Sequence, residues 1–200
     1  MSRASDAPRY AVGLDLSLTG SGVAVISLDT GHVRLGLVET KGAAKARLDQ
    51  TLDRLAAALQ GISYEVPAER CVVVIEAPSL GSQNGKSHER AGLWWRTAGL
   101  LHSRGHVIAQ AYPRTRAKYA AGHLPVKSTR KGPDKREVVA ALAAEHPHLN
   151  LSNDNVADAF ALACMGARYL GSPIDSSTRQ RVEATAAVRW PEHIQEGMTS

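Results

Sequence analysis

The sequence contains few aromatic residues and few cysteines. Aromatic residues make up 4% of the 200 residues, so the core must be built largely from Ala, Val and Leu. The two cysteines, Cys71 and Cys164, lie in separate apolar runs, and neither has a second Cys or a His at zinc-binding spacing. This pattern excludes a disulfide framework and a zinc-finger class. It predicts two small buried thiols in a reducing cytoplasm.

The chain also lacks a long hydrophobic run. No apolar stretch approaches the roughly 20 residues that a membrane-spanning helix needs. Residues 1–9 are polar, so we expect a flexible N-terminus rather than a secretory signal. The length of 200 residues suits one ordinary domain. We therefore expect a cytoplasmic protein, and the abundance of Ala and Arg favours a bacterium, or a phage protein in its host's cytoplasm.

The hydrophobic pattern predicts one α/β domain over residues 10–170. Five short apolar runs predict strands at Tyr10–Asp15, Val23–Ser27, Val33–Glu39, Cys71–Ile75 and His106–Tyr112. Apolar spacings of three and four predict helices at Ala43–Ile62, Ala91–Arg104, Thr115–Ala121, Asp134–Glu145 and Asn153–Leu170, the last capped by Asn153 or Asp154. Three strands in a meander, followed by alternating helices and strands, predict a mixed five-stranded sheet flanked by helices. Residues 171–200 lose this periodicity and are expected to form a poorly defined C-terminal tail, of which residues 188–190 could dock on the domain.

Three acidic residues occupy positions where a charge is costly. Asp15 and Glu76 end apolar strands, and Asp158 is surrounded by apolar residues one turn into the last helix. If the first and fourth strands are neighbours, Asp15 and Glu76 lie side by side, and the last helix could bring Asp158 to them. Clustered carboxylates repel one another unless a cation is present, and their oxygens suit Mg²⁺ or Mn²⁺.

Each acid taken alone has a simpler explanation. Asp15 could cap a turn with the hydroxyls of Ser17 and Thr19, Glu76 could pair with an arginine, and Asp158 could face solvent. Acids at strand ends after buried runs are not a surface pattern, however. The three together therefore favour a shared cation site.

Eight basic residues lie between Pro113 and Arg136, against the single acid Asp134. They are Arg114, Arg116, Lys118, Lys127, Arg130, Lys131, Lys135 and Arg136. Such a segment can neutralise phosphates and release counterions from nucleic acid. A solvated basic face is the alternative. The position between the second and third acids, and the net charge of +5, favour nucleic-acid binding.

Three motifs, in order, resemble those of RuvC-type Holliday-junction resolvases (crossover junction endodeoxyribonucleases) of the RNase H-like superfamily. They are residues 13–22 (GLDLSLTGSG), residues 74–76 (VIE) and residues 157–163 (ADAFALA). The resemblance covers about residues 10–170. It implies an RNase H-like fold, an Mg²⁺- or Mn²⁺-dependent site with two ions, a homodimer, and paired nicks in branched DNA at a four-way junction. Asp15, Glu76 and Asp158 carry over as catalytic, metal-binding carboxylates.

The resemblance also bears on a fourth ligand and on Lys118. The family places an Asp or His one turn before the last Asp, where this chain has Asn155 beside Asp154; we favour Asp154 on charge. Lys118, followed by Gly122, and Lys135 match two family lysines. Lys118 is thus expected to orient either a phosphate or the attacking water. Of Trp94 and Trp95, one is expected in the core and the other at a dimer interface.

A departure from the family keeps other functions open. Its resolvases carry an aromatic residue after the second acid that wedges into the junction, whereas residues 77–80 here read APSL. This departure favours relaxed substrate choice that includes flaps or forks. An actin- or sugar-kinase-like phosphotransferase is a less favoured alternative, because it would need a duplicated domain to enclose ATP. A non-catalytic DNA-binding protein would bind phosphates more tightly without acids beside them, so the retained acids argue against this alternative.

Overall fold

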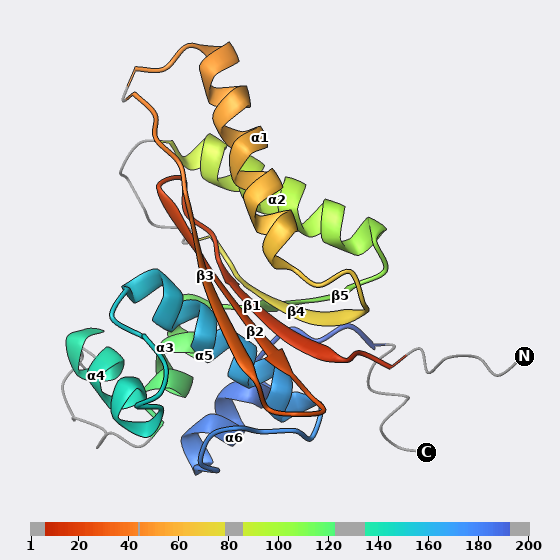
Figure 1. Cartoon of the computed structure of the whole chain (residues 1–200), viewed down its shortest axis with the longest axis vertical. Coiled ribbons are helices and arrows are strands. Elements are labelled where there is room, and N and C mark those ends of the chain that lie inside the picture. The colour runs from red at the N-terminus through yellow and green to blue at the C-terminus, as the bar shows by residue number, and fades with distance from the viewer. Residues whose placement is uncertain (1–6, 44, 79–85, 123–134, 193–200) are drawn as a thin grey trace, which may run out of the picture.

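The computed structural model describes residues 7–43, 45–78, 86–122 and 135–192. A central sheet separates two layers of helices, with α1 and α2 on one face and α3, α4, α5 and α6 toward the other (Figure 1). The strands are β1 (Tyr10–Asp15), β2 (Gly20–Ser27), β3 (Val33–Glu39), β4 (Cys71–Glu76) and β5 (Val107–Ala111). The helices are α1 (Leu48–Glu65), α2 (Ser87–Ser103), α3 (Pro113–Ala120), α4 (Lys135–Glu145), α5 (Asp154–Tyr169) and α6 (Arg179–Ala186).

The sheet has the mixed topology that the sequence predicts. Its strand order is β3-β2-β1-β4-β5. The β1–β2 and β2–β3 pairs are antiparallel, and the β1–β4 and β4–β5 pairs are parallel. Residues 71–75 of β4 are all buried, as expected for a strand covered on both faces. The predicted α/β fold with a five-stranded mixed sheet is confirmed.

Strand alternation decides where the two strand-end acids point. Leu14 on β1 and Ile75 on β4 both belong to the hydrophobic cluster beneath α1 and α2. Successive side chains of a strand point to opposite faces. The next residues, Asp15 and Glu76, therefore project toward the face that α5 covers.

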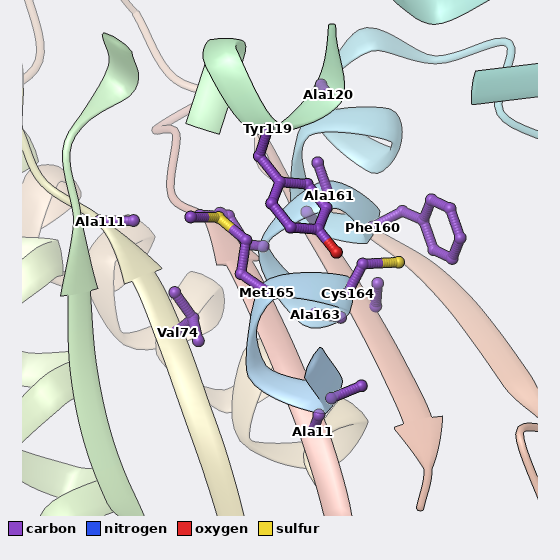
Figure 2. Packing of buried hydrophobic residues seen from close by; sticks show 14 of the residues in the cluster. Ala11, Val74, Ala111, Tyr119, Ala120, Phe160, Ala161, Ala163, Cys164 and Met165 are labelled. Atoms are coloured by element: carbon purple, nitrogen blue, oxygen red, sulfur yellow. The ribbon is translucent and has the colours of Figure 1, made fainter. Parts of the chain in front are cut away.

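Helix α5 packs unusually close to the sheet. A Cβ atom on Gly13 would lie 2.0 Å from the carbonyl oxygen of Ala159, and one on Gly22 would lie 1.9 Å from that of Asn155. Figure 2 shows alanines on α5, including Ala161 and Ala163, in the same cluster as side chains of the sheet. Every residue from 156 to 167 is buried. The two glycines therefore let the helix backbone lie against β1 and β2, which fixes the depth of Asp158.

We expect Gly13→Ala to destabilise the domain by about 1–3 kcal/mol or more, because the added methyl group meets helix backbone that cannot rotate away. Urea unfolding measures this loss. Gly99→Ala on α2 is the matched control, since a Cβ there meets nothing within 4 Å and Ala is the better helix former. Equal stability of Gly13→Ala and the parent would show that α5 does not need this close approach.

The chain beyond residue 170 differs from the predicted tail. Arg181 of α6 is fully buried, and the main chains of Arg189 and Gln110 exchange hydrogen bonds of 2.9 and 3.2 Å. Trp190 stacks on Tyr169 with ring centroids 3.8 Å apart. The prediction of a poorly defined tail is thus wrong for residues 179–187, and residues 188–190 dock on the domain, which the sequence left open. Residues 193–200 lie outside the described residues. Hydrophobic periodicity missed this segment because polar side chains anchor much of it.

Several element boundaries also differ from the predictions. Helix α1 begins at Leu48 instead of Ala43, and α2 begins at Ser87 instead of Ala91. Strand β2 begins at Gly20, within the predicted break, because Gly22 continues the strand beneath α5. Asp134, the predicted start of α4, lies outside the described residues.

Both cysteines are buried free thiols, as predicted. Burial raises the pKa of the Cys71 thiol to about 12, and it also raises that of Cys164. Both side chains therefore stay protonated near neutral pH. Within the ranges that the structure describes, no helix is long and apolar enough to cross a membrane.

Candidate active site

The strand-end acids lie together at one edge of the sheet. Strands β1 and β4 are parallel neighbours with Leu14 opposite Ile75, so Asp15 and Glu76 follow at the same level. Both acids line a pocket of about 170 Å³ together with Arg90. The predicted proximity of these two acids therefore agrees with the structure.

Arg116 of α3 connects Glu76 to Asp158. Its Nε donates to Glu76 Oε2 at 2.7 Å, and its Nη1 donates to Asp158 Oδ1 at 2.6 Å. The exposed fractions are 13% for the arginine side chain, 14% for that of Glu76 and 5% for that of Asp158. One largely buried guanidinium thus joins acids from β4 and α5.

Arg116 also lies within electrostatic range of Asp15. Burial by itself lowers the pKa of the guanidinium, but the hydrogen bond to Glu76 and the charges of Glu76, Asp158 and Asp15 together raise it above its ordinary value. Arg116 therefore remains charged. Two acids that are distant in the sequence thus pair with one positive charge, and a third lies within its electrostatic range.

Two further contacts fix the surroundings of these acids. The indole Nε1 of Trp94 donates to the main-chain oxygen of Glu76 at 2.9 Å, which ties the end of β4 to α2. Trp94 is 9% exposed and packs in the core, as predicted for one of the two tryptophans. Its neighbour Trp95 is 70% exposed.

The first turn of α5 bears on the predicted fourth ligand. Asn153 caps the helix by accepting from the main-chain nitrogens of Asn155 and Val156. The Asn155 amide nitrogen donates to the Gly20 carbonyl oxygen at 2.8 Å, which ties the helix to β2. Asp154 is exposed. The choice between Asp154 and Asn155 as fourth ligand stays a prediction.

Lys118 does not join the acids in this structure. Its Nζ lies 2.6 Å from Glu183 Oε2 of α6. Residues two apart on a helix do not share a face, so Arg116 reaches the acids while Lys118 points elsewhere. This arrangement departs from the catalytic position predicted for Lys118.

The rest of the predicted basic segment is only partly described. Arg114 on α3 and Arg136 on α4 are exposed. Lys127, Arg130 and Lys131 lie outside the described residues, and of Lys135 only the main chain is described. DNA binding by this segment stays a prediction.

The carboxylates of these acids suit a hard divalent cation, although in this structure two of them pair with an arginine. Among the described residues, no group of three or more His, Cys, Asp or Glu side chains is close enough to hold one metal ion. Glu76 and Asp158 instead each give an oxygen to Arg116. Carboxylate oxygens are the ligands that Mg²⁺ and Mn²⁺ prefer, and two of these acids already pair with a positive charge.

The position of Arg116 beside Glu76 was predictable from the strand order, although the sequence instead favoured DNA binding by Arg116. Glu76 is paired with Ala111 at the end of β5. The helix after β5 therefore starts beside Glu76, and an arginine on its first turn can reach it. Glu76 does pair with an arginine, as its simpler explanation required. The simpler explanation for Asp158, that it faces solvent, is wrong, because Asp158 is 4% exposed.

A mixed sheet of order β3-β2-β1-β4-β5 flanked by helices is the RNase H-like α/β fold, and this chain carries acids at the ends of β1 and β4. Within that class, the chain has the fold of the RuvC-type Holliday-junction resolvases, as its structural neighbours show.

Three solved structures carry this comparison. RuvC of T. thermophilus in complex with a Holliday junction substrate has a TM-score of 0.55 and 15% identity over 82% of this chain and 96% of that chain. A second Thermus thermophilus RuvC structure has a TM-score of 0.51 and 16% identity over 82% and 97%. The yeast mitochondrial Holliday junction resolvase Ydc2 has a TM-score of 0.53 and 12% identity over 82% and 80%. No family model and no curated protein matches the sequence.

Proposed function

We propose that this protein is a metal-dependent, structure-selective DNA endonuclease that resolves Holliday junctions by paired phosphodiester hydrolysis. One observation carries the proposal. Glu76 and Asp158 share one guanidinium, and Asp15 ends the neighbouring strand level with Glu76, so acids from three distant segments meet at one edge of a RuvC-like sheet. The similarity to a RuvC solved with a Holliday junction substrate supports this choice of reaction and substrate.

Asp15, Glu76 and Asp158 would hold two Mg²⁺ or Mn²⁺ ions, with Asp154 or Asn155 as a further ligand. Such ions, when bound, activate a water and stabilise the leaving oxygen of a phosphodiester. The chain itself contributes rigid placement of the ligands. Trp94 anchors the end of β4, and the contact of Gly13 with α5 sets the depth of Asp158.

The basic segment between Pro113 and Arg136 would bind the DNA backbone. Arginine and lysine neutralise phosphates without reading sequence, so they suit an enzyme that recognises the shape of branched DNA. The exposed Arg114 is available for such a contact. Lys118 belongs to the same proposed surface if DNA takes the place of Glu183 as its partner.

We expect Lys131→Ala to weaken binding to junctions, flaps, forks and linear duplex alike. Loss of one phosphate contact should flatten the slope of log K against log salt by about 0.9 on duplex DNA. Fluorescence anisotropy titrations over a salt series measure this slope. An unchanged slope would place Lys131 on a solvated face away from DNA.

Paired nicks require two active sites, so we propose that the working form is a homodimer. The exposed Trp95 on α2 and Leu48 on α1 are apolar surface suited to an interface between copies. Sedimentation equilibrium with and without junction DNA measures the oligomeric state. We also propose that the protein acts in the cytoplasm, where its two free thiols stay reduced.

The test of the function is cleavage of labelled four-way junctions, flaps, forks and linear duplex with Mg²⁺ or Mn²⁺ at matched salt. We expect paired symmetric nicks in the four-way junction and little cleavage of linear duplex. A nuclease specific for flaps or forks is the second candidate, favoured by the absence of an aromatic residue at positions 77–80. Faster cleavage of flaps than of junctions would select it.

Two further alternatives have their own signatures. A phosphotransferase would bind ATP tightly and cleave no DNA, but the described residues form one five-stranded sheet and thus one half of an ATP-enclosing pair. A non-catalytic binder would hold branched DNA with no cleavage at any divalent-ion concentration. Either result would overturn the proposal.

A further inference from the structure

We infer that Arg116 is an internal cation that holds the acids together in the metal-free protein and must leave them when a divalent ion binds. The inference rests on the proposed function, because it takes Asp15, Glu76 and Asp158 to be metal ligands. It concerns a different property, namely what occupies and controls the site before the metal arrives. The juxtaposition of one guanidinium with acids from β4 and α5 carries it.

The geometry makes Arg116 a competitor for metal. Its two hydrogen bonds, 2.7 Å to Glu76 and 2.6 Å to Asp158, use carboxylate oxygens that a metal would need. The guanidinium is a rigid planar fork, so it can join acids from two separate elements at once. A divalent ion in the same group of acids would repel it strongly, because little solvent lies between them to screen the charges.

The same contacts explain how the acids can stay close without metal. Like charges repel when brought together in a poorly solvated place. Arg116 offsets this repulsion between Glu76 and Asp158, so the folded chain keeps the ligands near their working positions. The cost is weaker metal binding, since part of the binding free energy is used to separate Arg116 from its partners.

The test measures Mn²⁺ binding without DNA, from the loss of the electron paramagnetic resonance signal of free Mn²⁺. We expect Arg116→Gln to bind Mn²⁺ at least about 5-fold more tightly than the parent, the lower end of typical couplings between two binding events. Arg116→Lys keeps the charge but loses the planar fork, so its Mn²⁺ affinity should lie between those of the parent and of Arg116→Gln. Arg96→Gln removes the same charge from an exposed position of α2 and is the matched control.

A second measurement follows Arg116 in the parent protein itself. The Arg116 Nε–H donates to Glu76 in the metal-free protein and should exchange slowly with solvent in ¹⁵N NMR spectra. We expect added Mg²⁺ to shift this signal and speed its exchange. Arg116→Lys identifies the signal by its loss.

The outcomes separate this inference from the proposed function. If the parent binds Mn²⁺, Asp15→Asn abolishes that binding, and Arg116→Gln leaves the affinity unchanged or weaker, the internal-cation inference fails while the metal site stands. An Arg116 signal that is unaffected by Mg²⁺ at saturation would overturn the inference equally. If neither the parent nor Arg116→Gln binds Mn²⁺, both proposals fail.

Discussion

Asp15→Asn is expected to lower the rate of junction cleavage by about 1,000-fold or more. Metal ions contribute several kcal/mol of charge stabilisation to phosphodiester cleavage, and each 1.36 kcal/mol corresponds to a tenfold change in rate. The amide has nearly the same shape as the carboxylate but loses its charge. Single-turnover cleavage of a labelled four-way junction measures the rate.

DNA binding by Asp15→Asn should equal or exceed that of the parent, because a negative charge near phosphates is removed. Asp53→Asn, at an exposed acid on α1, is the matched control and should cleave at the parent rate. Cleavage by Asp15→Asn at the parent rate would remove Asp15 from the active site and with it the proposed mechanism.

Arg181→Met is expected to cost about 3–5 kcal/mol of unfolding free energy, the usual loss when one partner of a buried ion pair is removed. Arg181 is fully buried and donates to Glu145 at 2.9 and 2.7 Å. Its Nε also lies 3.4 Å from the buried carboxylate of Asp175. The substitution therefore leaves Glu145 of α4 without its main partner, whereas Asp175 keeps its ion pair with Arg168.

Urea unfolding at neutral pH measures the Arg181→Met effect. Arg179→Met is the matched control on the same helix, since the Arg179 side chain is 92% exposed and should contribute little. A loss as small as that of the control would mean that α6 is not anchored by its arginine.

The ion pair between Arg181 and Glu145 also predicts that the stability of the protein depends on pH in the acidic range. The hydrogen bond from Arg181 holds the pKa of the Glu145 carboxyl well below its ordinary value of 4.5. A lowered folded-state pKa stabilises the protein above the unfolded value, and this stability is lost as the pH falls toward the folded value. We expect the parent to lose more stability than Arg181→Met between about pH 5 and pH 3, as measured by urea unfolding over a pH series.

The sequence predicted the parts of the fold that depend on periodic apolar residues. Strand β4 is buried on both faces and helix α5 on nearly all sides, so both form long apolar runs in the sequence. Both were therefore predicted with nearly their observed bounds. The convergence of Asp15 with Glu76 was also predictable, since parallel neighbouring strands end at the same edge.

The role of Arg116 and the docking of α6 were not predictable in the same way. Both depend on ion pairs between residues 36 to 42 positions apart, such as Arg116 with Asp158 and Arg181 with Glu145. No local sequence pattern indicates which distant acid an arginine pairs with. Arg116, Lys118 and Arg114 look alike as charges in the sequence, and only the direction of each side chain on α3 separates them.

The bridge between Gln110 and Arg189 has a consequence for biosynthesis. Strand β5 forms one border of the sheet, and its outer main-chain groups at Gln110 pair with Arg189, in the segment after α6. An uncovered border can pair with a strand of another molecule. A ribosome-bound intermediate that lacks residues 188–190 would expose this border, so the nascent polypeptide remains open to mispairing until these residues have been synthesised and have docked.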